Sequence, residues 1–153
     1  MKATDILMEE HRVIERVLDA LEIAANRLLA GQVIPMDFFL KATDFIKNFA
    51  DGCHHKKEEG VLFVALAANG MSQDTEPLCI MLAEHEEGRH LTRALREGAE
   101  RVQGGDTTAM LQRPLWENSR PVRLTFARQE SSACSKKVLF PDFNQNALLP
   151  EGE

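Results

Sequence analysis

Residues 53–63 hold the side chains with the clearest capacity for chemistry. They include two imidazoles and two carboxylates, with His54 four residues before Glu58 and His55 four residues before Glu59. Because residues four apart share one face of a helix, each pair would present a nitrogen and an oxygen donor together. One helix cannot surround a metal ion. A metal site is therefore expected only if neighbouring segments bring further donors to the same place.

The other histidines lie far away in the sequence, at His11, His85 and His90. His11 and His85 each fall inside an apolar stripe, whereas His90 lies about 140° from His85 and is expected to point away from the core. His11 is about 20 residues before the first interhelical connection and His54 about 20 residues after it, so both would lie near 30 Å from that end. The sequence therefore predicts that His11, His54 and His85 meet at a common depth.

Mixed nitrogen and oxygen donors suit iron, manganese or zinc better than calcium or magnesium. A buried carboxylate such as Glu58 is costly unless it is paired, and a divalent or trivalent cation would neutralise it. The alternative is that Glu58 and Glu59 are solvated and that His54 and His55 pair with them at the surface.

Three long amphipathic segments are expected to carry these residues, over about residues 4–30, 36–68 and 78–102. Thr4 or Asp5 can cap the first segment, and Gly31 can end it. Gly52, inside the second segment, is expected to mark a bend or a close approach just before the cluster. The expected buried faces are Leu7, His11, Ile14, Leu18, Leu21, Ala25 and Leu28; Phe38, Ala42, Phe45, Phe49, Leu62, Ala65 and Leu66; and Leu78, Met81, His85, Gly88, Thr92, Leu95, Ala99 and Val102.

The fold expected from these segments is an all-α, up-down-up-down four-helix bundle. Short connections between long amphipathic segments favour antiparallel neighbours, and 153 residues suit a single domain over 1–153. The fourth helix is expected to be irregular, because Pro114 and Pro121 interrupt its pattern and residues 118–137 are polar without a clean period.

The composition argues against several classes of protein. A formal net charge of −6 without a basic stripe disfavours a nucleic-acid partner. No run of about 18 apolar residues and no signal peptide is evident, so we expect no membrane association and a cytoplasmic location. The cysteines at 53, 79 and 134 are odd in number and widely spaced, which predicts reduced thiols.

The histidine and glutamate motifs resemble those of the hemerythrin-like, or HHE cation-binding, family. The matching stretches are residues 8–15, 51–63 and 82–89, and the likeness is clearest over residues 1–105. The combination is specific, although each stretch alone would be weak. This resemblance implies a four-helix bundle around a non-haem di-iron site.

The resemblance also implies which residues would bind the metal. His11 matches the histidine of the first helix, His54 and Glu58 match the HxxxE of the second, and His85 matches the histidine of the third. Glu58 would then be a bridging carboxylate, and His55 could be an additional ligand.

Two parts of the family pattern differ here. His85 and Arg89 resemble an HxxxR form of the third helix, which would leave Arg89 near the site without ligating. The HxxxE of the fourth helix is missing, because Ser131 and Ser135 stand where its histidine and carboxylate are expected. Glu130 or Cys134 could substitute. We therefore expect weaker iron binding, with one or two ions.

The function implied by the resemblance is binding or sensing of dioxygen or another small oxidant, or iron handling. A binding protein is expected rather than an enzyme, and a homodimer is compatible with the sequence. Three alternatives stay open: an iron enzyme that acts on peroxide or nitric oxide, a metal-free bundle that serves as a protein-interaction module, and a bundle with structural zinc.

Overall fold

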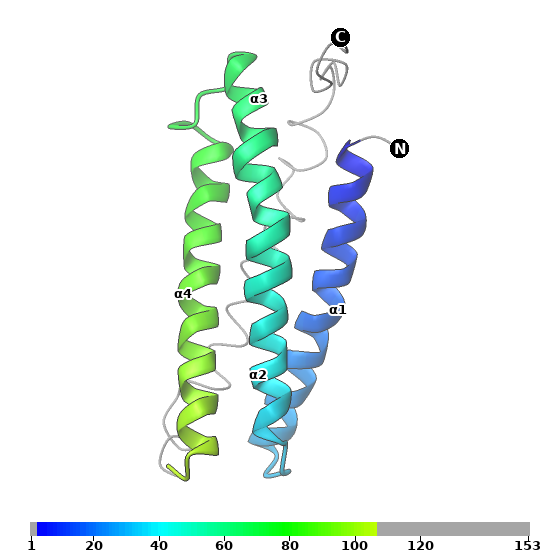
Figure 1. The fold of residues 1–153 in the computed structure, drawn as a ribbon, viewed down its shortest axis with the longest axis vertical. Coiled ribbons are helices and arrows are strands. Elements are labelled where there is room, and N and C mark those ends of the chain that lie inside the picture. Colours follow the sequence, from blue (N-terminus) through cyan, green and yellow to red (C-terminus); the bar gives the residue numbers. More distant parts are fainter. Residues whose placement is uncertain (1–2, 107–153) are drawn as a thin grey trace.

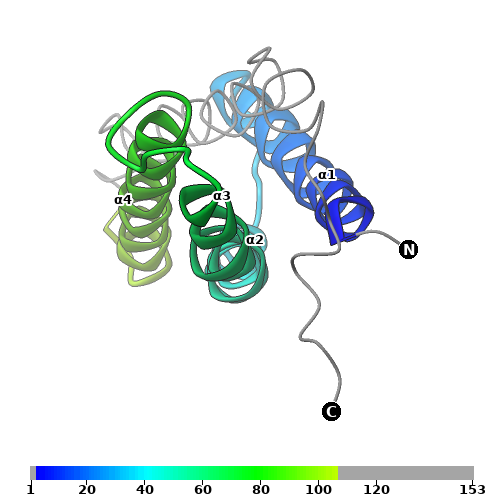
Figure 2. The same ribbon diagram turned by 90° about the horizontal axis from the view of Figure 1, so that it is seen from above.

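A computed structural model describes residues 3–106, which form helices and contain no strand. Helix α1 (Ala3–Leu29) runs down one side, a second rod returns from Met36 to Ala68, and α4 (Leu78–Gln103) runs down again (Figure 1). From above, the second rod lies between α1 and α4, and both pack against it (Figure 2). The all-α class is confirmed for these residues, whereas the expected fourth helix lies outside them.

The second rod is one continuous run of helical turns with two kinds of hydrogen bonding. It consists of α2 (Met36–Phe45), the π-helical segments η1 (Ile46–His55) and η2 (Glu58–Leu62), and α3 (Phe63–Ala68). Its bounds match the expected segment over 36–68. Gly52 lies in η1, where an added Cβ would meet the Lys47 carbonyl oxygen at 3.1 Å. The expected close approach at Gly52 is therefore present.

The π-helical turns keep one face of this rod straight. Its buried positions recur every four residues, at Ala42, Ile46, Ala50, His54, Glu58, Leu62 and Leu66. At 3.6 residues per turn, each step of four would rotate the next position by about 40°, and the stripe would wind around the rod. The wider i→i+5 turns of a π-helix rotate each step in the opposite direction and offset this drift. The stripe therefore stays aimed at the interior.

Glycines end two of the rods. Gly31 follows α1 at φ 77° and Gly70 follows α3 at φ 94°, a left-handed conformation that glycine adopts without a steric penalty. The Gln32 amide donates to the Arg27 carbonyl, and the Gly31 amide donates to that of Leu28, both at 2.9 Å. This Schellman pattern satisfies carbonyls left open at the helix end and reverses the chain.

The predicted start of the first helix was slightly late. Because α1 already includes Ala3, Thr4 and Asp5 lie in its first turn and do not cap it. Asp5 there is favourable for the helix dipole. No helix within residues 3–106 is long and apolar enough to cross a membrane.

Two apolar clusters form the interior. The larger joins all three rods below the histidines, and the smaller lies above them near the α3–α4 turn. The larger contains Ile14, Leu18, Leu21, Ala24, Met36, Phe39, Ala42, Ile46, Ala50, Leu91, Leu95 and Ala99. The smaller contains Leu7, Leu62, Phe63, Leu66, Leu78 and Met81. Between them, in sequence and in space, lies the layer that holds the histidines.

The expected face of the second rod was partly wrong near its start. Phe39 is fully buried, whereas Phe38, Phe45 and Phe49 are only partly buried and pack at the edge of the larger cluster. The rod contacts α1 and α4 on different sides, so a single 3.6-residue stripe does not describe its buried surface.

The two adjacent phenylalanines test this orientation. We expect Phe39→Ala to lower the free energy of unfolding by about 3–5 kcal/mol, because it leaves a cavity in the core. The matched change Phe38→Ala should cost about 1–2 kcal/mol, because less apolar surface is lost. Urea unfolding monitored by circular dichroism measures both values. Equal costs for the two variants would contradict the assigned orientation.

Candidate metal centre

The histidines and Glu58 form a buried polar layer between the two apolar clusters. His54 is 0% exposed, His55 and Glu58 are each 2% exposed and His85 is 1% exposed. The side chain of His11 is 16% exposed. The alternative in which His54, His55 and Glu58 form solvated surface pairs is therefore wrong for these residues.

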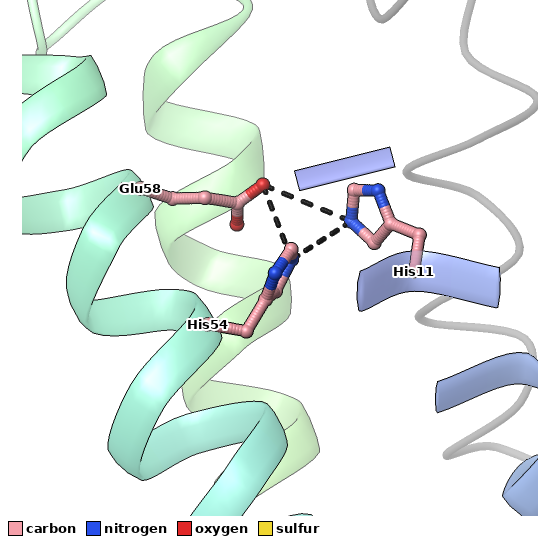
Figure 3. A group of neighbouring side chains, drawn as sticks. All are labelled: His11, His54 and Glu58. Carbon is pink, nitrogen blue, oxygen red and sulfur yellow. Dashed lines mark hydrogen bonds and ion pairs between the residues drawn. The ribbon is translucent and has the colours of Figure 1, made fainter. Parts of the chain in front are cut away.

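The first donor group joins α1 to the second rod. His11 Nε2 lies 3.0 Å from His54 Nε2, and Glu58 Oε1 lies 3.4 Å from His54 Nε2 and 3.7 Å from His11 Nε2 (Figure 3). Donors bonded to one ion at about 2.1 Å would be about 3.0 Å apart at a right angle and about 3.4 Å apart at a tetrahedral angle. These separations fit a shared cation. Two imidazole nitrogens this close must share either a proton or a metal ion.

The second donor group joins the second rod to α4. His55, Glu58 and His85 each offer one atom, and these atoms lie within 4.8 Å of one another. The rings of His55 and His85 are stacked, with centroids 3.8 Å apart. Glu58 Oε2 is 3.1 Å from His85 Nε2, yet neither atom has a hydrogen-bond partner within the described residues. Buried lone pairs that face each other without a hydrogen bond are what a bound cation would satisfy.

Glu58 belongs to both groups and divides its oxygens between them. Oε1 faces the pair of His11 and His54, and Oε2 faces His85 of the other pair. Each group therefore offers two imidazoles and one carboxylate oxygen, and the groups meet at one side chain.

Three of the histidines are oriented by carboxylates on their other ring nitrogen. Glu10 Oε2 accepts a hydrogen bond from His54 Nδ1 at 2.9 Å, and Glu59 Oε1 accepts one from His85 Nδ1 at 2.6 Å. Asp51 Oδ1 lies 3.4 Å from His55 Nδ1. A carboxylate that accepts the Nδ1 proton fixes the ring and leaves a lone pair on Nε2 that can bind a metal ion. This is the arrangement found around metal-binding histidines.

Two cations hold these carboxylates in turn. Arg89 donates from Nε to Asp51 and from Nη2 to Glu59, both at 2.6 Å, so one guanidinium positions the partners of both histidines of the second group. Lys57 donates to Glu10. These two contacts place Arg89 near the site, as the family resemblance implied.

The pKa shifts follow from burial and these contacts. Burial alone would raise the pKa of Glu58, but the neighbouring imidazoles His54 and His85 outweigh it and lower the pKa, so the carboxylate stays ionised. Burial, assisted by His85, lowers the pKa of His55 to about 4. Burial also lowers the pKa of His11. Near neutral pH these two rings are uncharged, the form that binds metals.

Comparison with known proteins agrees with the sequence motifs. The family model of the hemerythrin HHE cation-binding domain matches residues 2–117. The chain belongs to this family. No curated protein and no solved structure matches the chain significantly. Cation binding, the property for which the family is named, is what the two donor groups could provide.

The structure brings together all five predicted site residues. His11, His54 and Glu58 form one group, and His55 and His85 share Glu58 in the other. His90 is exposed and takes no part, as expected. The positions considered for the fourth helix, Glu130, Ser131, Cys134 and Ser135, lie outside the described residues. Metal ligation itself stays a prediction.

Sequence reasoning did not assign roles to Glu10 or Asp51, and it paired Glu59 with His55, whereas Glu59 accepts a hydrogen bond from His85. Asp51 could have been found, because it stands four residues before His55 on the same helix face. Glu10 and Glu59 each adjoin a candidate ligand in sequence, but their partners lie 44 and 26 residues away. Only the packing of the rods reveals those two contacts.

The lowered pKa of His55 predicts a pH dependence of the metal-free protein. The unfolded chain, with a histidine pKa near 6.5, takes up this proton before the folded chain does at about 4. His55 therefore lowers the free energy of unfolding by about 2 kcal/mol as the pH falls from 7 to 5. Urea unfolding of chelator-treated protein at both pH values measures this change.

The His55→Gln variant isolates that contribution, because His11 and His54 are present in both chains. Its free energy of unfolding should fall less between pH 7 and 5 than that of the unaltered protein. The same pH dependence in both chains would show that His55 titrates normally.

Proposed function

We propose that this protein binds non-haem iron as a two-ion centre and uses it to bind or sense dioxygen or another small oxidant. The observation that carries the proposal is the division of Glu58: its two oxygens face two separate histidine groups. A carboxylate placed in this way can bridge two cations, and the low pKa of Glu58 keeps it ionised for that role.

The donor set supports iron over the other candidates. Each group consists of two histidines and one carboxylate oxygen, a set typical of non-haem Fe(II) sites that keep coordination positions open. Structural zinc sites are usually closed by four protein ligands, whereas each group here supplies three within residues 3–106. Manganese is compatible with the same donors.

When bound, iron would supply an open coordination position and electrons for the small oxidant. The protein contributes orientation and exclusion of water. Glu10, Asp51 and Glu59 hold the imidazoles with Nε2 directed inward. The apolar clusters above and below limit the access of water to the layer.

Iron reconstitution tests the ligand assignment. Anaerobic addition of Fe(II), followed by removal of excess metal and iron quantification, should give up to two ions per chain. His54→Ala should lose at least one ion, because His54 belongs to the first group and packs on His11. His90→Ala is the matched control and should bind as much iron as the unaltered chain, because His90 is exposed. Retention of all iron by His54→Ala would remove His54 from the centre.

Exposure to dioxygen separates a binding protein from an enzyme. Air added to the iron-loaded protein should produce a new optical absorption that is reversed by removing oxygen, with no net consumption of the oxidant. The same addition to Glu58→Gln should give a much weaker change, because the bridging charge is lost. Continuous consumption of oxygen, peroxide or nitric oxide would instead favour an enzyme. Failure to bind any iron would favour the metal-free interaction module.

A further inference from the structure

A cleft of about 200 Å³ lies between the second rod and α4, beside the second donor group. Small residues create part of its space, since Gly88 has no side chain and Thr43 and Thr92 are short. Gly88 lies one turn beyond His85 on the same helix, so the cleft opens next to the second donor group. The remaining lining residues are Ile46, Lys47, Asp51, His55, Arg89, Arg93 and Arg96.

The charges around the cleft are unbalanced. Four lining residues are cationic and only Asp51 is anionic. Arg89 is already paired with Asp51 and Glu59, and Arg96 is paired with acidic residues outside the cleft. Within residues 3–106, no ion pair or hydrogen bond involves the side chain of Lys47 or of Arg93. Because both side chains line the same cleft, an anion bound there could pair with them.

The size and lining of the cleft favour an organic anion over an inorganic one. More of the lining surface is apolar than polar, with Ile46 and the threonine methyl groups contributing hydrocarbon. A cavity of about 150 Å³ admits benzene, so this space accommodates a compact hydrocarbon body of at least that size. Pockets with apolar walls and a few convergent polar groups are typical of small-molecule sites.

We propose that the cleft binds a small organic carboxylate. Its hydrocarbon part fills the space between Ile46 and Gly88, and its carboxylate pairs with Lys47 and Arg93. The site differs from the metal centre but shares one residue with it, because His55 lines the cleft and belongs to the second donor group.

This shared residue would couple the two sites. Because His55 lines the cleft, any effect of the bound carboxylate on metal affinity would be matched by an equal effect of the metal on carboxylate affinity. That consequence rests on the proposed function, whereas carboxylate binding itself does not. The two ideas can therefore fail separately, and binding is tested first on the metal-free protein.

Benzoate is the probe, titrated into chelator-treated protein at low salt and followed by amide chemical shifts. We expect saturable binding in the millimolar range or tighter, with the largest shifts at residues 43–51 and 88–96. The Lys47→Gln/Arg93→Gln double variant should bind at least tenfold more weakly. Both side chains are exposed, so this variant should fold normally.

Three controls make the result decisive. The Lys56→Gln/Arg12→Gln variant removes two exposed charges elsewhere and should bind benzoate as the unaltered chain does. Benzyl alcohol, a neutral analogue, should bind at least tenfold more weakly, and inorganic phosphate should not bind as tightly as benzoate. Absence of saturable binding, equal binding by the double variant, or equal binding of either control compound would overturn the proposal.

Discussion

One ionised carboxylate buried between two apolar clusters is the constraint on which the rest of this structure depends. Glu58 is withdrawn from water, yet its surroundings keep it charged. An isolated charge in such a place would be strongly destabilising. Four imidazoles from all three rods surround Glu58. The positions of α1 and α4 are those at which their histidines can reach this carboxylate.

Polar groups surround Glu58 in successive shells of imidazoles, then acidic side chains, then cations. The imidazoles are backed by Glu10, Asp51 and Glu59, and these acids are backed by Lys57 and Arg89. The cations hold the acidic side chains, and the acidic side chains hold the imidazoles, so the Nε2 atoms stay directed toward Glu58. The second group is organised more tightly than the first, because a single guanidinium holds the partners of both of its histidines.

Much of this arrangement could be predicted from the sequence, because apolar periodicity and helix length together specify depth in a bundle. The three rods and the meeting of His11, His54 and His85 followed from that reasoning. The inward direction of both His54 and His55 was harder to foresee, because a regular α-helix separates adjacent residues by about 100°. Here α1 faces one of them and α4 the other, and the π turns hold the rod in that orientation. The buried Phe39 and the distant partners of Glu10 and Glu59 depend on tertiary packing, which no local pattern records.

The two donor groups span different seams of the bundle. One connects α1 to the second rod, and the other connects that rod to α4. Partial loading would therefore fasten one helix pair while the other remained held by side-chain packing alone. A chain carrying a single ion could therefore exist in two forms, one with α1 fastened to the second rod and one with α4 fastened to it. The order in which the groups fill would decide which of these two helix pairs stiffens first.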